Sequence, residues 1–214
     1  MGKLYRLDNA KKYWTEITKT IIKKIANASF FNYIRYVKSV EKYHLDIEID
    51  NLTNSILNTI SGDSFPTEVL PLLKSDLKNV TKLKGWQFSW SEEFKLKDRS
   101  IYKLTIKDNP TIIQGLISLS DYNDHYFVHI IESAPFNLGK KKLYEGVAGN
   151  LFAFACKTSW DKSYQGFISF TSKTKLIEHY EKTLEAVHIG GNKMVIFPRE
   201  ALKLILKYFP TKTI

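Results

Sequence analysis

The stretch Gly146-Val-Ala-Gly-Asn-Leu151 combines small residues with the start of an apolar helical pattern. Small side chains at positions 146, 148 and 149 would let the backbone approach a bulky anion closely. A helix there would present unpaired N–H groups and the positive end of its dipole, which suits a pyrophosphate. Short glycine-rich turns also occur where helices simply pack closely. Phosphate binding and close packing therefore both remain open on these residues alone.

Histidine and cysteine offer two further kinds of chemistry, and their positions argue against both. His125 and His129 form a His-x-x-x-His pair, but we predict a β-strand over the segment 125–132. Residues four apart on a strand lie ~13 Å from each other, too far to share one zinc ion. Cys156 is the single cysteine and lies in an apolar run, so we expect a buried thiol and a reducing, cytoplasmic compartment. No nucleophile elbow for a serine hydrolase is present, and we predict no metal site.

The elements that must position these residues change in character along the chain. Apolar residues recur at helical spacing over 10–28, and over 45–60 a helix is favoured over a strand. From Trp86 onward we predict strands at 87–94, 100–107, 111–119 and 125–132. A helix from 143, a strand at 166–171, a helix over 173–185, a strand at 193–197 and a helix over 198–209 follow.

This order is an antiparallel meander followed by strand–helix–strand–helix–strand. It predicts an α/β (α+β) fold with a mixed, mostly antiparallel sheet and crossover helices. We divide the chain into an N-terminal helical segment, residues 1–85, and a core over residues 86–214. The N-terminal segment is expected to pack on the core or to extend it.

The composition allows a substantial core and argues against nucleic-acid binding and against a membrane protein. Of the 214 residues 43% are hydrophobic, and the formal net charge is +10. The 32 basic residues include few arginines, only Arg6, Arg35, Arg99 and Arg199. Arginine carries most bidentate phosphate and guanine recognition, so we expect a solvated basic surface rather than a nucleic-acid site. We predict no membrane span and no signal peptide, because no apolar segment of the required kind is present.

Two motifs resemble those of the GCN5-related N-acetyltransferases. Gly146-Val-Ala-Gly-Asn-Leu151 is similar to the Gly-Ile-Gly-x-x-Leu core of that family's acetyl-CoA loop, and Ser133-Ala-Pro135 loosely matches the element before it. Leu176-Ile-Glu-His-Tyr-Glu-Lys182 resembles the family's Leu-Tyr-Glu-Lys-x-Gly-Phe motif. The resemblance covers about residues 86–209 and makes the core acyltransferase-like. Leu143 replaces the Arg or Gln that opens the family's loop, and an alternative alignment places Gly139 and the following lysines there.

The resemblance implies a binding mode for acetyl-CoA as co-substrate. The pyrophosphate would be held by the backbone amides of Val147, Ala148, Gly149 and Asn150. The main chain from Ile131 to Ser133 would pair with the pantetheine arm, as an added strand does.

The resemblance also implies catalytic roles. Tyr180 would protonate the departing thiolate, although its place beside Leu176 and Leu184 suits a core tyrosine equally well. Glu132, with His129 behind it, is the candidate base that deprotonates the amine. Their spacing is odd, so a regular strand would point them to opposite faces unless a bulge intervenes.

We therefore expect an acetyl-CoA-dependent N-acyltransferase that moves an acetyl group to an amine by direct attack in a ternary complex. Two alternatives remain open. One is a non-catalytic binding module on the same fold. The other is a nucleic-acid-associated factor that would use the aromatic and basic stretch 30–42.

Overall fold

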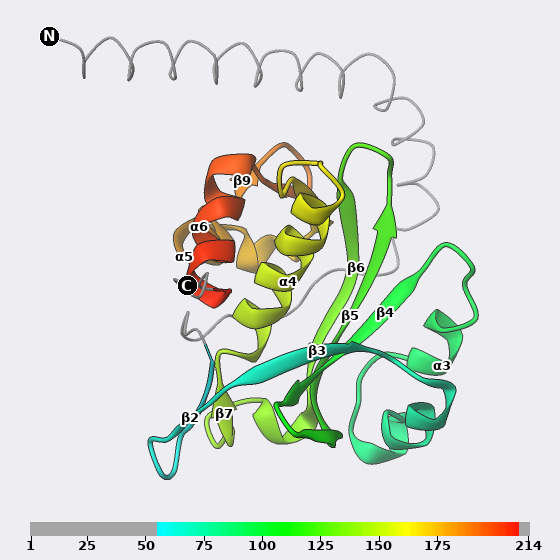
Figure 1. The fold of residues 1–214 in the computed structure, drawn as a ribbon. Coiled ribbons are helices and arrows are strands. Elements are labelled where there is room, and N and C mark those ends of the chain that lie inside the picture. Colours follow the sequence, from blue (N-terminus) through cyan, green and yellow to red (C-terminus); the bar gives the residue numbers. More distant parts are fainter. Residues whose placement is uncertain (1–54, 210–214) are drawn as a thin grey trace, which may run out of the picture. The chain divides into compact units, whose positions relative to one another are not determined.

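The computed structural model describes residues 55–209, in which a seven-stranded sheet carries most of the helices (Figure 1). Its strands lie in the order β3-β4-β5-β6-β8-β10-β9. They are β3 (Thr67–Pro71), β4 (Ser100–Ile106), β5 (Asn109–Asp121), β6 (Tyr126–Ser133), β8 (Ile168–Thr171), β9 (Val187–His188) and β10 (Lys193–Ile196). Every pairing is antiparallel except that of β6 with β8. The predicted mixed, mostly antiparallel sheet is confirmed.

A second, smaller sheet has the order β2-β1-β7. Its strands are β1 (Ile56–Asn58), β2 (Ser64–Phe65) and β7 (Tyr144–Glu145). The helix expected over 45–60 is therefore wrong for the described part of that window. Leu57 pairs with Glu145, far along the chain, and such a non-local partner overrides the local helical spacing.

The expectation of a helical segment up to residue 85 is also wrong for residues 55–85. They contribute β1, β2 and β3, together with two short 3-10 helices, η2 (Lys74–Asn79) and η3 (Lys82–Lys84). Strand β3 pairs with β4 and so belongs to the main sheet. The helix predicted over 10–28 and the aromatic stretch 30–42 lie outside the described residues.

The remaining helices include the predicted ones in the predicted order, and α3 and η4 are additions. They are α3 (Trp90–Glu93), η4 (Pro135–Asn137), α4 (Val147–Asp161), η5 (Thr174–Leu176), α5 (Ile177–Leu184) and α6 (Pro198–Tyr208). The strand expected over 87–94 is wrong, because α3 lies there. Trp90 and Glu93, one helical turn apart, are both buried, which is the geometry of a helix face rather than a strand. The predicted helix from Leu143 begins only at Val147.

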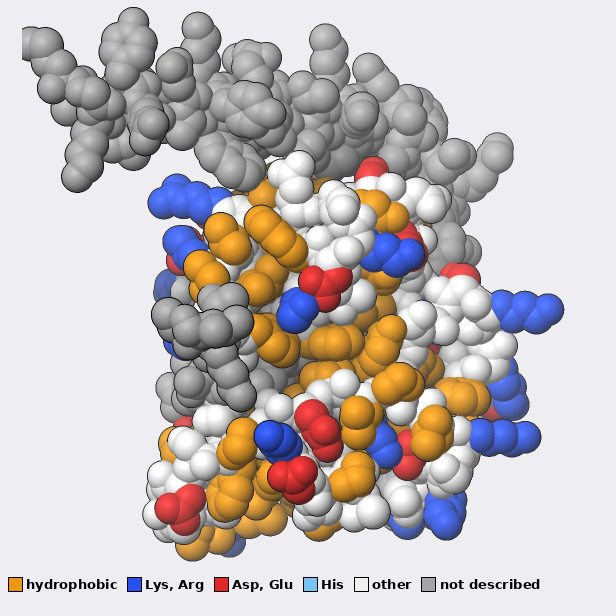
Figure 2. All heavy atoms as spheres, in the orientation of Figure 1, with side chains coloured by type: hydrophobic (Ala, Val, Ile, Leu, Met, Phe, Trp, Pro, Cys, Tyr) orange, Lys and Arg blue, Asp and Glu red, His pale blue; other side chains and the backbone are white. Residues whose placement is uncertain are grey.

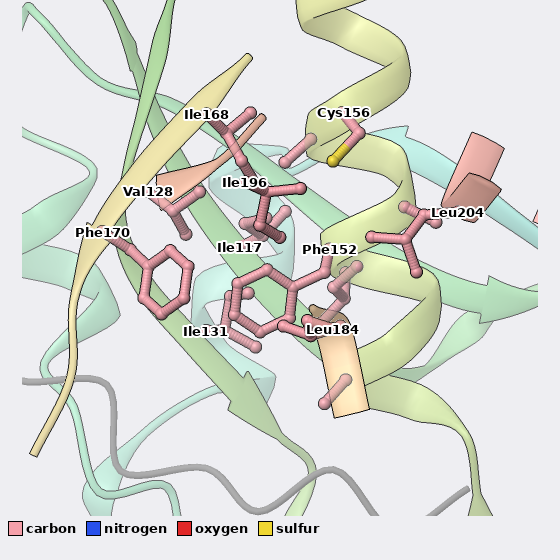
Figure 3. Close-up of a cluster of buried hydrophobic side chains, with 14 of the residues drawn as sticks. Ile117, Val128, Ile131, Phe152, Cys156, Ile168, Phe170, Leu184, Ile196 and Leu204 are labelled. Carbon is pink, nitrogen blue, oxygen red and sulfur yellow. The ribbon is translucent and has the colours of Figure 1, made fainter. Parts of the chain in front are cut away.

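One face of the sheet is covered by α4, α5 and α6, and the main apolar core lies between them and the strands (Figure 3). Val128, Ile131 and Phe170 of the sheet meet Phe152 of α4 in this cluster. Because side chains alternate along a strand, Glu132 points to the other face of β6, where it meets α3. The sheet therefore separates α4 from α3.

Helix α4 begins very close to β5. A Cβ atom at Gly115 would lie 2.7 Å from Cγ1 of Val147 and 3.0 Å from the carbonyl oxygen of Glu132. Only glycine leaves enough space there for the first turn of α4 to rest on the sheet. Among residues 55–209, none of the helices has both the length and the apolar character that crossing a bilayer requires.

Candidate functional site

Strands β6 and β8 run parallel for three residue pairs and then separate. The pairs extend from Tyr126↔Ile168 to Val128↔Phe170, and β8 ends at Thr171. Strand β6 continues to Ser133, still paired with β5. The amide of Ala134 donates to the carbonyl of Gln114, which places the main-chain groups of Glu132 on the same, β5-facing side.

The intervening residues therefore present their main-chain groups to the side where β8 has diverged. These are Ile131 and Ser133, the two residues expected to pair with a pantetheine arm. No strand pairs with this part of β6 on that side within residues 55–209. A free strand edge of this kind can accept an extended ligand by main-chain hydrogen bonds.

The first turn of α4 combines available donors with deep burial. Gly146 caps the helix at a positive φ of 87°, which glycine adopts without strain. The amide of Asn150 donates to the carbonyl of Gly146 at 3.0 Å, as in any helix. Helix geometry leaves the N–H groups of Val147, Ala148 and Gly149 without a partner four residues back. Val147 and Ala148 are each 3% exposed.

The Asn150 side chain ties this turn to its surroundings. Its Nδ2 donates to the Gly146 carbonyl at 2.8 Å and reaches the Ser55 carbonyl at 3.5 Å. Its Oδ1 accepts from the Thr67 hydroxyl at 3.0 Å. Asn150 therefore acts in this structure as a brace between α4, β3 and the chain entering β1. The alternative phosphate partners are Lys140, Lys141 and Lys142. The first two lie exposed before the turn, and Lys142 is partly buried and paired with Glu145 at 3.4 Å.

Glu132 is a buried carboxylate that accepts from three donors. The amide of Gln87 lies 2.5 Å from Oε1, while the amide of Phe88 and the indole Nε1 of Trp90 lie 3.4 and 2.7 Å from Oε2. Burial raises the pKa of Glu132 above its ordinary value, and the three hydrogen bonds offset part of that rise. The group is thus held in one orientation and has more affinity for a proton than an exposed glutamate.

Tyr180 lies in the apolar layer on the other side of the sheet. It is 0% exposed, and its ring packs edge-on against Phe170 and Phe152 at centroid distances of 5.2 and 5.8 Å. Tyr180 and Glu132 therefore do not share a face. They lie on opposite faces of the sheet, near the point where β6 and β8 begin to separate.

His129 lies on the same face as Glu132, contrary to what a regular strand predicts. A register shift opposite Ser118 and Leu119 marks a bulge, which changes the alternation of side chains between them. His129 Nε2 lies 3.0 Å from the hydroxyl of Ser120. Burial, and to a smaller extent the Arg99 guanidinium, lower the pKa of His129 to about 2, so it is neutral.

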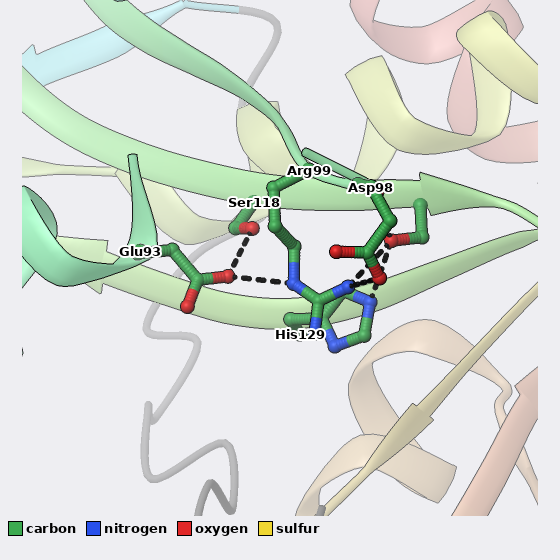
Figure 4. A network of polar contacts seen from close by, with 6 residues as sticks. Glu93, Asp98, Arg99, Ser118 and His129 are labelled. Carbon is green, nitrogen blue, oxygen red and sulfur yellow. Dashed lines mark hydrogen bonds and ion pairs between the residues drawn. The ribbon is translucent and has the colours of Figure 1, made fainter. Parts of the chain in front are cut away.

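An ionic network that no sequence motif predicts lies beside these residues (Figure 4). Arg99 Nε donates to Glu93 Oε1 at 3.0 Å, and the Ser118 hydroxyl donates to the same oxygen at 2.6 Å. Arg99 Nη1 donates to Ser120 Oγ at 2.9 Å and also contacts Asp98. The network joins α3, the loop before β4, and strands β5 and β6.

A cavity of about 290 Å³ opens where β3 ends and β4 begins. It is lined by Pro71, Leu72, Phe94, Arg99, Ser100, Ile101 and Tyr102. Tyr102 of β4 pairs with Ile117 of β5, which pairs with Ile131 of β6. The cavity therefore lies two strands away from Ile131, in the same row of the sheet.

A second polar contact lies at the opposite end of β6. His125 Nδ1 lies 2.5 Å from Asp124 Oδ1, and His125 Nε2 lies 2.8 Å from the Ser169 hydroxyl. This order of groups is that of a nucleophile relay. However, Ser169 is buried in mid-strand, and the contact pins the β5–β6 turn to β8.

The remaining reactive groups offer no further site among residues 55–209. No three His, Cys, Asp or Glu side chains there gather closely enough to hold a metal ion. Cys156 is fully buried, and burial raises the pKa of its thiol.

Comparison with known proteins finds similarity in solved structures alone. No family model matches the chain, and neither does any curated protein. Mutant forms of the spermidine/spermine N-acetyltransferase SpeG from Vibrio cholerae are similar at 15% identity and a TM-score of 0.48, covering 64% of this chain and 96% of that one. The Vibrio cholerae spermidine N-acetyltransferase in complex with CoA and spermine is similar at 16% identity and a TM-score of 0.43, covering 64% and 98%.

Proposed function

We propose that this protein is an acetyl-CoA-dependent N-acyltransferase that moves an acetyl group to an amine. The observation that carries the proposal is the separation of β6 from β8 after Val128, with the main-chain groups of Ile131 and Ser133 turned toward the gap. An extended pantetheine arm can pair with such an edge as an added strand. The crossover helix between the two strands then brings its amino end to the same region.

The diphosphate would bind at that amino end. The N–H groups of Val147, Ala148 and Gly149 and the positive end of the helix dipole are suitable partners for it. Gly115 supports this arrangement by letting the turn lie against β5. The turn is buried, with Asn150 bonded to Thr67 and Ser55, so we expect the chain around Ser55 to shift when the diphosphate binds.

The reaction we propose is a direct transfer. The amine nitrogen attacks the thioester carbonyl carbon, a C–N bond forms, and the C–S bond breaks. Glu132 takes the proton that the amine loses, and Tyr180 gives a proton to the departing thiolate. Their positions on opposite sides of β6 suit a thioester held in the gap between them. Burial raises the pKa of Glu132 toward neutral pH, and a general base works best when its pKa is near the working pH.

A non-catalytic binding module is the second candidate. The three N–H donors that already bond to the Glu132 carboxylate favour it, because they lower the affinity of this group for a proton. The two candidates differ in turnover and not in fold.

Isothermal titration with acetyl-CoA and with CoA tests binding, and mass spectrometry of an amine panel tests transfer. The panel should include a polyamine, a free lysine, an aromatic amine and a peptide N-terminus. An acetylated amine whose yield falls in Glu132→Gln supports the enzyme. Binding without any transfer supports the module, and no binding at millimolar acetyl-CoA by folded protein removes both.

A further inference from the structure

The short helix α3 contacts the buried Glu132 carboxylate through Trp90 and carries a second buried carboxylate, Glu93. The indole Nε1 of Trp90, at its start, donates to Glu132 at 2.7 Å. Glu93, at its end, accepts from Arg99 and from the Ser118 hydroxyl of β5. Trp90 is 0% exposed, so its ring has no freedom to move without repacking. One helical turn thus connects the Glu132 carboxylate of β6 with the Glu93–Arg99 ion pair and, through Ser118, with β5.

All the hydrogen bonds that the described residues make to the Glu132 carboxylate come from N–H groups. The amide of Gln87 donates to Oε1, and the amide of Phe88 and the indole of Trp90 donate to Oε2. A proton on either oxygen would point toward a donor and find no acceptor there. The arrangement therefore favours the ionised form, against the effect of burial.

We propose that Trp90 is a positioning residue, whose indole N–H orients the Glu132 carboxylate and stabilises its ionised form. Helix α3 can do this because Glu93 anchors it to β5. The consequence for catalysis rests on the proposed function, whereas the effect on Glu132 itself does not.

Charged neighbours contribute less than these hydrogen bonds. Lys103 lies on the same face in the same row of the sheet, two strands from Glu132, and its ammonium is paired with Asp76 at 3.0 Å. His129 is neutral, and Arg99 is paired with Glu93 and Asp98. Burial raises the pKa of Glu132, and its three hydrogen-bond donors lower it.

Trp90→Phe removes the N–H and keeps an apolar ring. Trp86→Phe is the matched control, since Trp86 is buried in the same segment and does not bond to Glu132. The carboxyl carbon of Glu132 is followed by ¹³C NMR across pH in the full chain and assigned with Glu132→Gln. We expect the pKa of Glu132 to rise by about one unit in Trp90→Phe, because a donor to the anion is worth about that much, and to stay within ~0.3 units in the control.

An equal shift in both variants, or none in Trp90→Phe, overturns the inference. If Trp90→Phe does not fold, the unmodified protein gives the answer. The Trp90 indole N–H resonance should move with the titration of Glu132 and become independent of pH in Glu132→Gln, and an unresponsive resonance overturns the inference. The pH profile of acetyl transfer is a separate readout. If the carboxyl pKa shifts in Trp90→Phe while the acidic limb of the pH–rate profile does not, Glu132 is not the base, and the positioning role of Trp90 still holds.

Discussion

The two faces of the main sheet are held together by different interactions. On the side of α4, α5 and α6, residues such as Phe152, Phe170 and Tyr180 form a continuous apolar layer. On the side of α3, buried polar groups bond to one another, among them Glu132 and the Glu93–Arg99 pair. Figure 2 shows one outer face of the protein, on which some apolar side chains are also exposed, among polar and charged ones.

The difference has a physical consequence. Apolar packing is roughly proportional to buried area and has little directional preference. Buried ionic groups need particular partners, and a single missing partner leaves an uncompensated charge. We therefore expect the apolar face to determine stability through the volume of its buried side chains. We expect the polar face to determine how side chains such as Glu132 are oriented and how stability responds to pH.

Phe152→Ala should produce the largest effect on the apolar face. The ring is fully buried between Phe170 and Tyr180, so its loss leaves a cavity. We expect the free energy of unfolding to fall by about 3–5 kcal/mol in urea titration. Leu206→Ala is the control, because the Leu206 side chain lies on the exposed face of α6, and it should change the free energy of unfolding little. A loss below about 1 kcal/mol for Phe152→Ala would mean that this layer is not the main source of stability.

Arg99→Met should be nearly as damaging on the polar face, for a different reason. It leaves the buried Glu93 carboxylate without its cation, which we expect to destabilise the fold by about 3 kcal/mol. The double variant Arg99→Met with Glu93→Leu removes both charges and should be more stable than the single variant. Chemical denaturation of all three proteins measures this, and additive losses would contradict a coupled pair.

Tyr180→Phe separates a catalytic hydroxyl from a packing ring. The phenyl group preserves the contacts with Phe152 and Phe170. If the hydroxyl gives its proton to the thiolate, kcat should fall about 100-fold while the free energy of unfolding changes by about 1 kcal/mol. A loss of stability with unchanged turnover would assign Tyr180 to the core alone.

His129 should make the polar face sensitive to acid. Its pKa is about 2 in the folded state, and the ordinary value is 6.5. The unfolded chain therefore binds more protons below pH 6.5, and this group's contribution to stability is lost as the pH falls through that range. The slope is at most about 1.4 kcal/mol per pH unit. His129→Asn should show a correspondingly shallower decline between pH 6.5 and 5 in thermal or urea unfolding, and parallel curves would contradict this.

Much of the fold could be predicted from periodicity. Strands β4, β5 and β6 and helices α5 and α6 lie where the local patterns place them, because each pattern and its buried face agree. Strand β1 could not be found in this way, since its pairing with β7 joins residues more than 80 positions apart. Helix α3 was missed because four residues are too few to establish a helical period.

The candidate site was only partly visible in the sequence. The strand predicted over 125–132 ends one residue before β6 does, and the small residues from Gly146 lie at the start of α4. The donors to Glu132 come from residues 87–90, more than 40 positions earlier, and were not predicted. Arg99, Ser118 and Ser120 carry no recognisable motif, and only the sheet brings them together. The bulge that turns His129 toward α3 likewise depends on pairing with β5.

The central claim is that an acyl thioester binds along the part of β6 from which β8 has separated. Amide-resolved ¹⁵N NMR during titration with acetyl-CoA tests it most directly. We expect the amides of Ile131, Ser133 and Val147 to Gly149 to shift together and saturably, while those of the exposed pair Glu178 and Lys182 do not. Saturable shifts elsewhere, with these five amides unchanged, would contradict it.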